Sequence, residues 1–342
     1  MHPPKEVTIY DIAKKLHISG ATVSRGLNNH PAINEKTKKK IQDTARKMGY
    51  RSNNFASNLR RQKTNTIGII IHELNSQFIT SVLAGIEKVM ANTGFDLIIG
   101  HSSESADKEI ANAHNLFHKR VDGLIASLAY NTKDTAHYEP FIKKGIPVVF
   151  FDRVEANGPG TKVVIDNFKA GFDAATHLVK QGCKNIAHIT ASLTRNVYAD
   201  RLSGFKKALL ENGQPVNDAN IYVNDLSEEA SLAAAQNILA MHPRPDGVFI
   251  TNDFCAALCI KVWKEAGLRI PADIAVVGFN NDVISKIIEP ALTTINYPGI
   301  EMGEVAAKCL LQQLNGNVVQ KNDIIVIQSG LIVRASSDRT IF

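Results

Sequence analysis

The stretch VTIYDIAKKLHISGATVSRGLN, residues 7–28, contains two short amphipathic segments separated by a tight turn. Its apolar residues recur every three or four positions, which is the period of a helix with one buried face. Thr8 can cap a first helix over Ile9–Leu16, and Ser19 can cap a second helix from Gly20 to about Asn28. The pattern therefore predicts a small helical unit in this part of the chain.

A third amphipathic helix follows in the sequence. Asn34 precedes the run 35–48, whose apolar side is formed by Ile41, Ala45 and Met48, and Gly49 can end the helix. Two short helices joined by a tight turn form a helix-turn-helix, which places its second helix in the major groove of DNA. A three-helix bundle without a DNA role is the alternative.

Charge is distributed unevenly along the 342 residues and favours the DNA-binding interpretation. Residues 1–65 hold fourteen Lys and Arg against four Asp and Glu, whereas the rest of the chain holds 25 cations and 29 anions. A basic head on a mildly acidic body indicates a polyanionic partner for the head alone.

The head resembles the lactose-repressor (LacI/GalR) family, whose members begin with a run like VTIYDIAKKLHISGATVSRGLN. The similarity extends from Val7 to about Arg61, although His17 stands in the turn where the family usually has Gly. The resemblance implies that the start of the second helix reads bases. Arg25 can bond guanine bidentately, whereas Gly20 has no side chain to read with and Ala21 offers only contact with a thymine methyl.

The basic run YRSNNFASNLRRQKTNT, residues 50–66, reads as a linker from its composition. By resemblance, residues 51–65 are a hinge in which 54–61 fold into a helix only on operator DNA, and Leu59 wedges into the minor groove. Ser52 departs from the proline that relatives often carry. The expected DNA-contacting residues are Thr8, Tyr10, Ser19, Gly20, Ala21, Thr22, Ser24, Arg25, Asn28, Tyr50, Asn53, Ala56 and Leu59.

From residue 66 onward, apolar β-branched runs alternate with amphipathic helices such as 77–92 and 254–266. Buried parallel strands covered by helices on both faces have this pattern, and nine or more strands predict two doubly wound α/β subdomains. The predicted strands are 66–71, 95–100, 122–127, 146–151, 162–165, 185–190, 246–251, 273–279 and 293–297.

The resemblance covers nearly the whole chain and makes this body an effector core similar to periplasmic pentose- and hexose-binding proteins. We expect a helix-turn-helix head over 1–50 and a hinge over 51–65. The first subdomain is expected to combine 66–164 with about 295–325, and the second to combine 165–294 with about 326–342.

Ligands of such sheets bind beyond the carboxyl ends of the strands. Polar and aromatic residues that follow the predicted strands are His72, Glu73, Asn75, Phe78, His101, Ser102, Tyr130, Asp152, Arg153, Ser192, Asn252, Asp253 and Asn280. This mixture of amides, carboxylates, Arg and rings suits a ligand dense in hydroxyls, such as a sugar. Asn252 and Asn280 are each expected to open a helix, so helix capping is the alternative for both.

The resemblance supports several of these positions through the motifs FDR, RLSGF, TND and GFNN. NSQF departs from the family's NPF around Phe78, Asn280 stands where sugar-binding relatives often carry Asp, and Tyr297 replaces a smaller polar residue. Arg153 and Arg201 could instead form ion pairs between the subdomains. The expected effector-contacting residues are Asn75, Phe78, His101, Tyr130, Asp152, Arg153, Ser192, Arg201, Asn252, Asn280 and Tyr297.

The chain carries no GxGxxG, P-loop, GxSxG or HExxH motif, so we expect neither an enzyme nor a cofactor. Cys183, Cys255, Cys259 and Cys309 form no CxxC pair, and we expect no metal site. No apolar run approaches the roughly 18 residues that span a bilayer. Because MHPPKEVTIYD lacks an apolar signal segment, we expect a cytoplasmic location. A periplasmic sugar receptor would share the body but not the basic head.

The sequence thus predicts a homodimeric transcription regulator, expected to be a repressor, that binds pseudo-palindromic operator DNA and responds to a sugar. A nucleobase or a phosphorylated sugar is the alternative effector. No heptad segment follows GLIVRASS before the closing DRTIF, so we expect no tetramer of the lactose-repressor kind. The sequence leaves open whether the effector releases the protein from DNA or helps it bind.

Overall fold

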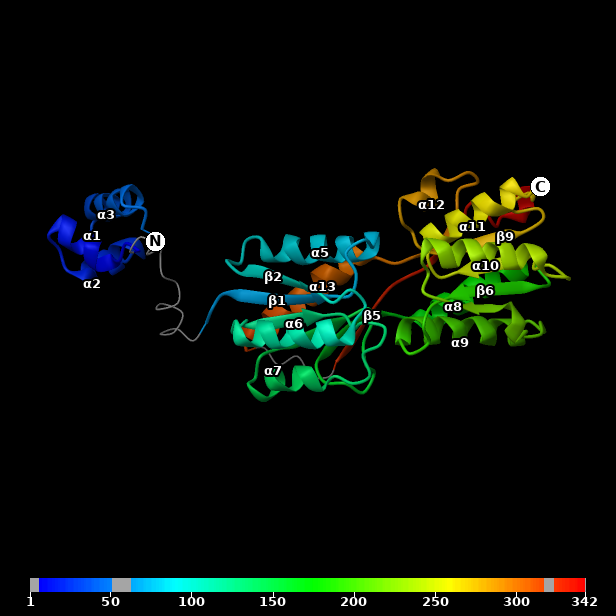
Figure 1. The fold of residues 1–342 in the computed structure, drawn as a ribbon, viewed down its shortest axis with the longest axis horizontal. Helices are drawn as coiled ribbons and strands as arrows, with labels where there is room; N and C mark the ends of the chain where they lie inside the picture. The colour runs from blue at the N-terminus through cyan, green and yellow to red at the C-terminus, as the bar shows by residue number, and fades with distance from the viewer. Residues whose placement is uncertain (1–5, 51–62, 317–322, 342) are drawn as a thin grey trace, which may run out of the picture. The chain divides into compact units, whose positions relative to one another are not determined.

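The computed structural model describes residues 6–50, 63–316 and 323–341, and it divides into two compact units, Met1–Thr64 and Asn65–Phe342. Each unit is described by itself. Figure 1 labels the helices and strands along the chain.

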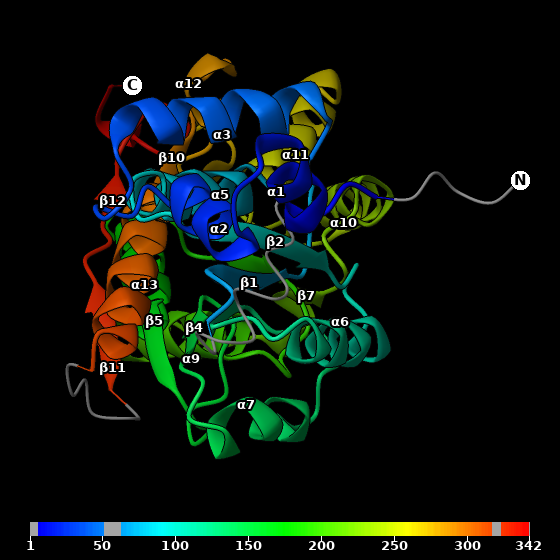
Figure 2. The same ribbon diagram turned by 90° about the vertical axis from the view of Figure 1, so that its left-hand side faces the viewer.

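The head contains the three helices that the sequence predicts: α1 (Ile9–Leu16), α2 (Gly20–Leu27) and α3 (Glu35–Lys47). The three helices lie side by side in both views (Figures 1 and 2) and enclose a small core. The buried residues of this core are Ile12, Ala13, Val23, Ile41 and Ala45. The core is built from the apolar faces that the helical period assigns, which confirms the predicted bundle.

Local polar contacts fix where these helices begin and end. The Asp11 carboxylate accepts hydrogen bonds from the Thr8 amide (2.8 Å) and the Thr8 hydroxyl (2.7 Å). Ser19 Oγ accepts from the Thr22 amide at 3.1 Å and so caps α2. His17 occupies the turn with φ of 54°, the left-handed region that the family's Gly would favour.

The first lobe of the body is a parallel sheet in the order β11-β5-β4-β3-β1-β2. Alternate residues of β1 face opposite layers: Ile69 packs with the core under α5 and α13, and Ile70 packs with the core under α6. The elements are β1 (Thr66–Ile71), α5 (Gln77–Met90), β2 (Asp96–His101), α6 (Ala106–His118), β3 (Gly123–Ala126), η1 (Ala136–Tyr138), α7 (Glu139–Lys143), β4 (Val148–Phe151), β5 (Thr161–Ile165), α13 (Gly299–Leu314) and β11 (Ile324–Ile327).

The second lobe is a sheet in the order β12-β10-β9-β8-β6-β7, parallel except for the antiparallel pair β10–β12. The elements are α8 (Asn167–Lys180), β6 (Ile186–Thr190), α9 (Asn196–Glu211), η2 (Asp218–Asn220), β7 (Ile221–Val223), α10 (Glu228–Ala240), β8 (Gly247–Ile250), α11 (Asp253–Glu265), β9 (Ala275–Asn280), α12 (Ile284–Ile287), β10 (Thr293–Asn296), β12 (Leu331–Ile332) and η3 (Arg339–Ile341).

All nine predicted strands are present, with bounds shifted by at most two residues. The sequence analysis missed β7, β11 and β12, each at the edge of its sheet. β7 and β12 span three and two residues and are not fully buried, so they carry no continuous apolar run. The run IIVI of β11 does carry a strand signal, even though Ile324 and Val326 are exposed there.

The chain crosses between the lobes three times, after β5, after β10 and after β11, because the strands on either side of each crossing belong to different sheets (Figure 1). These passages bring the carboxyl ends of the strands of both sheets toward one region of the body. Among the described residues, no helix is long and apolar enough to cross a membrane.

Candidate functional sites

The outer face of α2 carries most of the residues predicted to contact DNA. Ser19, Ala21, Arg25 and Asn28 are exposed, whereas Gly20, Thr22 and Ser24 are partly buried. Tyr10 of α1 is 73 % exposed, and a Cβ on Gly20 would lie 3.2 Å from its ring. The glycine therefore lets this ring lie beside the start of α2, where both can face a duplex.

Several predicted side chains also have a structural role. Thr22 Oγ1 shares a hydrogen bond of 2.8 Å with Ser19 Oγ, and the Asn28 amide donates to the Ser24 carbonyl at 2.8 Å. Thr8 is held by Asp11, and Tyr50 is half-buried against the core of the head. Asn53, Ala56 and Leu59 lie outside the described residues.

Most cations in the described part of the head form no ion pair that we find. Within its described residues we find one ion pair, between Lys38 Nζ and Glu35 Oε1 at 2.7 Å. Arg25 takes part in no ion pair that we find there and is free to meet an external anion or a base edge. The exposed cation on α2 is therefore a geometrically suitable DNA reader.

In the body, Asp152 lies where hydrogen bonds join the two lobes. It directly follows β4, and its backbone φ of 59° is in the left-handed region. Its carboxylate accepts from the Tyr297 hydroxyl at 2.5 Å, and its carbonyl accepts from the Asn196 amide at 3.2 Å. Asn196 Oδ1 in turn accepts from the Val154 amide at 3.0 Å. Residues of α9 thus fasten the segment after β4.

A cluster of rings surrounds Arg201 of α9. The guanidinium carbon lies 3.5 Å from the centroid of Phe279 and 5.3 Å from that of Tyr297. Tyr297 stacks on Phe78 with centroids 4.0 Å apart and an interplanar angle of 13°. Nε of Arg201 donates to Asn167 at 2.8 Å. The cation is thereby held against ring faces, which favours it electrostatically.

Arg153 joins a second group of side chains. Its Nη1 bonds both carboxylate oxygens of Glu104, at 2.7 and 2.8 Å, and its guanidinium carbon lies 4.1 Å from the ring centroid of Tyr130. Its Nη2 donates to the Tyr198 hydroxyl at 3.3 Å. Glu104 belongs to the same lobe, so the predicted alternative of an ion pair between the subdomains is wrong for Arg153.

Burial changes the protonation behaviour of these groups. Desolvation raises the pKa of Asp152, although Arg153 and the Tyr297 hydrogen bond oppose the shift. Burial also raises the pKa of Glu104 against the pull of Arg153. Desolvation lowers the pKa of His72, helped by Arg153. Burial makes the charged forms of these groups unfavourable unless they have hydrogen-bond or ionic partners. A ligand with hydroxyl or charged groups would supply such partners.

Two cavities adjoin this network. Phe78, Asn280 and Tyr297 line one of about 380 Å³. Tyr130 and Ser192 line another of about 620 Å³. The structure thus brings together Phe78, Tyr130, Asp152, Arg153, Arg201 and Tyr297 through direct contacts, and Ser192 and Asn280 through the cavities.

The remaining predicted residues do not join these contacts. Asn75 is exposed. His101 bonds Ser103 at 3.3 Å, and Asn252 caps α11 by accepting from the Cys255 amide at 3.0 Å. The prediction that Asn280 opens a helix is wrong, because α12 begins only at Ile284 and the Asn280 amide bonds Asp282.

Four residues of the network are absent from the predicted set: Glu104, Tyr198, Phe279 and Asn167. Glu104 lies three residues beyond β2, so the strand-end rule could have found it. Phe279 belongs to β9 itself, and Tyr198 and Asn167 lie in the first turns of helices, where that rule does not look. The single sequence carries no signal for these three.

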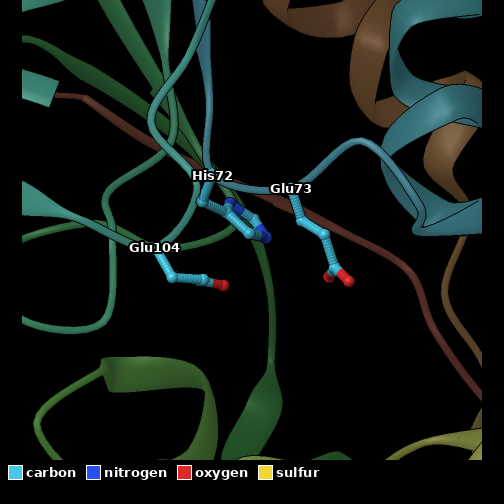
Figure 3. A group of neighbouring side chains, drawn as sticks. All are labelled: His72, Glu73 and Glu104. Carbon is cyan, nitrogen blue, oxygen red and sulfur yellow. The ribbon is translucent and has the colours of Figure 1, made fainter. Parts of the chain in front are cut away.

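Among the described residues, one group of side chains is close enough together to hold a metal ion. It consists of His72, Glu73 and Glu104, whose ligand atoms lie within 4.8 Å of one another. Figure 3 shows the imidazole of His72 with the carboxylates of Glu73 and Glu104 on either side of it. Glu104 is already committed to Arg153, and His72 Nδ1 bonds Ser127 Oγ at 3.0 Å. We call the region of the two cavities and of Asp152, Arg153 and Arg201 the cleft, and we interpret this group as part of its polar network.

Comparisons with known proteins find relatives of both the head and the body. The family model for bacterial regulatory proteins of the lacI family matches residues 8–53, and that for a periplasmic binding protein-like domain matches 175–337. The chain is 33% identical to the catabolite control protein A of Priestia megaterium over 92% of this chain and 95% of that one. It is 31% identical to the transcriptional repressor PurR of Escherichia coli over 96% of each.

Solved structures match over the whole length as well. A lac repressor dimer bound to operator and the anti-inducer ONPF has a TM-score of 0.84 and 25% identity, covering 97% of this chain and 99% of that one. A complex of the transcriptional regulator CelR with cellobiose has a TM-score of 0.72 at 23% identity, over 97% and 100% of the chains. The latter likeness concerns the fold alone.

Proposed function

This chain belongs to the lacI family of bacterial regulatory proteins, and from that premise we propose that it is a homodimeric transcription regulator whose operator affinity is set by a sugar. The exposed Arg25 on a capped α2 is the observation that carries the proposal. A recognition helix offers its side chains to base edges in the major groove, and Arg bonds guanine there bidentately.

The proposed DNA interface has two parts. Ser19, Ala21, Thr22 and Arg25 of the head meet the major groove, and the other basic residues of the head neutralise phosphates. The predicted hinge 51–65 supplies Asn53, Ala56 and Leu59 to the minor groove. Because residues 51–62 lie outside the described residues, the role of the hinge is part of the proposal.

Dimerisation follows from the same reasoning. A single head binds DNA weakly, and two heads related by a two-fold axis match a pseudo-palindromic operator. The similar lac repressor structure is a dimer bound to operator, which supports the same assembly here. A protein that acts on bacterial operators works in the cytoplasm, which is the location that we propose.

The effector is proposed to bind between the lobes, among Asp152, Arg153, Arg201 and the rings around them. Carboxylates, guanidinium groups and ring faces together recognise the hydroxyls and apolar faces of a sugar. The Tyr297–Asp152 and Asn196–Asp152 hydrogen bonds join residues of different lobes, so a ligand that breaks or replaces them changes how the lobes are held. Differential affinity for two such states is what couples effector to operator.

Selection of duplexes from a random pool by the full-length protein tests this function. We expect enrichment of a pseudo-palindromic sequence, bound by two chains per duplex and at least about a thousandfold more tightly than random DNA at the same salt concentration. An enriched pool without a two-fold motif, or none at all, would contradict the proposal. A sugar that changes the affinity for the selected duplex identifies the effector.

A further inference from the structure

Tyr297 occupies the places in the cleft that a sugar would use. Its hydroxyl donates to Asp152 Oδ1 at 2.5 Å, and its ring stacks on Phe78 at 4.0 Å. A third contact is edge-on to Phe279, with centroids 5.5 Å apart at 86°. Tyr297 is 6% exposed, so these contacts are enclosed.

A sugar bound here would need the same two partners. Carboxylate oxygens accept from sugar hydroxyls, and an aromatic face packs on the apolar face of the ring. Asp152 and Phe78 offer these groups, and Tyr297 engages both at once. The side chain of Tyr297 thus makes the same two contacts that a bound sugar would make: a hydrogen bond to the carboxylate and stacking on the ring.

We infer that Tyr297 is the specificity-determining residue of the cleft, acting as a built-in competitor that a sugar must displace from Asp152 and Phe78. The inference deepens the proposed function and rests on the effector site assigned there. The net binding free energy of a compact hexose or pentose is therefore only the difference between its own contacts with Asp152 and Phe78 and those of Tyr297. A ligand that also engages further groups is favoured over one that uses Asp152 and Phe78 alone.

Arg201 is the nearest such group. Among the described residues we find one hydrogen bond from its guanidinium group, from Nε to Asn167 at 2.8 Å. Its remaining nitrogens belong to a cation that is buried beside Phe279 and Tyr297. Displacement of the Tyr297 ring would expose these donors to the ligand.

The position of Tyr297 also links displacement to movement. It directly follows β10 of the second lobe, at the passage toward α13 of the first lobe, whereas Asp152 follows β4 of the first lobe. Their hydrogen bond therefore joins segments 145 positions apart in sequence. A sugar that takes Asp152 from Tyr297 removes a tie between the lobes in the same event.

Three proteins test the inference by calorimetric titration with D-ribose, D-glucose, D-galactose and cellobiose. Tyr297→Phe keeps the ring on Phe78 and frees the carboxylate, whereas Tyr297→Ser removes both contacts. We expect at least one sugar to bind Tyr297→Ser about tenfold or more tightly than wild type, as the loss of one charge-assisted competitor predicts. Tyr297→Phe should lie between the two.

Tyr138→Phe is the matched control. Tyr138 is also a buried tyrosine that donates to a buried carboxylate, Glu109, at 3.1 Å, and it lines neither cavity. Its sugar affinity should equal that of wild type. Equal affinities for all four proteins, or no sugar binding by any of them, would overturn the inference, and Tyr297→Phe keeps the test valid if the serine variant misfolds.

Binding of the selected duplex without sugar separates the two proposals. If the Tyr297 variants gain sugar affinity while no protein prefers any duplex, the regulator proposal has failed and the competitor role stands. If all proteins bind the duplex specifically while sugar affinities stay equal, the competitor role has failed and the regulator proposal stands.

Discussion

The guanidinium carbon of Arg201 lies 3.5 Å from the ring centroid of Phe279. Arg201 belongs to α9 and Phe279 to β9, so the contact joins a helix to the sheet that it covers. Arg201 is 3% exposed, and burial lowers its pKa, opposed by Tyr297, Tyr198 and Asp152. The rings and polar groups around it replace the water that it has lost.

Arg201→Lys should therefore not behave as a conservative change. A lysine ammonium cannot stack its charge over a ring as a planar guanidinium does, and it is more strongly hydrated. We expect the free energy of unfolding in urea to fall by about 2 to 4 kcal/mol. The exposed Arg244, changed to Lys in the same way, should alter it by less than about 0.5 kcal/mol. Equal effects of the two changes would show that the stack contributes nothing.

Gly204 allows α9 to pack closely on α8, and its substitution should reverse the usual order of helix propensities. In an exposed helix, Gly→Ala stabilises by about 1 kcal/mol. Here an added Cβ would lie 1.9 Å from the Phe168 carbonyl oxygen, a backbone atom that cannot turn aside. We expect Gly204→Ala to lower the free energy of unfolding by more than about 2 kcal/mol.

Ser203→Ala, at the exposed neighbouring position on the same helix, is the control for that measurement. It should leave the stability within about 0.5 kcal/mol of wild type. A stabilised Gly204→Ala protein would mean that the two helices are further apart than the structure has them.

His188 should make folding sensitive to acid. Its ring stacks on both Phe205 and Phe249, with centroids 4.8 and 4.7 Å away, and burial lowers its pKa from 6.5 to about 3. Because the folded pKa is below the unfolded one, the stability due to the neutral ring is complete above pH 6.5 and is lost as the pH falls toward 3. Between pH 7.5 and 5 this group alone should cost about 2 kcal/mol.

Urea unfolding of wild type and His188→Gln at those two pH values measures the contribution. The difference between the two pH values should be smaller in the variant by about 2 kcal/mol, because glutamine does not titrate. Replacing the ring also changes the stability at every pH. Comparing the change between the two pH values in each protein removes this constant contribution. An unchanged difference would mean that His188 takes up its proton at the same pH in the folded protein as in the unfolded chain.

The head was readable from sequence because its signals are local. Ser19 and Asn34 cap their helices three residues ahead of the amides that they bind, and Asp11 accepts from the Thr8 amide at the start of α1. The apolar period gives the buried faces. His17 could not be predicted in this way. The sequence allows His17 a left-handed φ in the turn, but only the structure shows that the residue adopts this conformation.

The cleft was only partly readable because its contacts are distant in sequence. Asp152 and Arg153 follow an apolar strand directly, so the strand-end rule places them correctly at the edge of a sheet. The same rule does not say that Tyr297, 145 positions away, engages that carboxylate, or that Glu104 pairs with Arg153. These pairings depend on how two sheets are joined, which no local pattern encodes.

Base reading by Arg25 is the central claim, and fluorescence anisotropy of the full-length protein on the selected duplex and on a scrambled duplex tests it most directly. Arg25→Ala should lose about 1 to 3 kcal/mol on the selected duplex and much less on the scrambled one. Lys36→Ala, the loss of a basic residue at the start of α3, should weaken both equally or neither. If Arg25→Ala weakened both duplexes to the same extent, α2 would be binding phosphates, and the assigned reading of sequence would be contradicted.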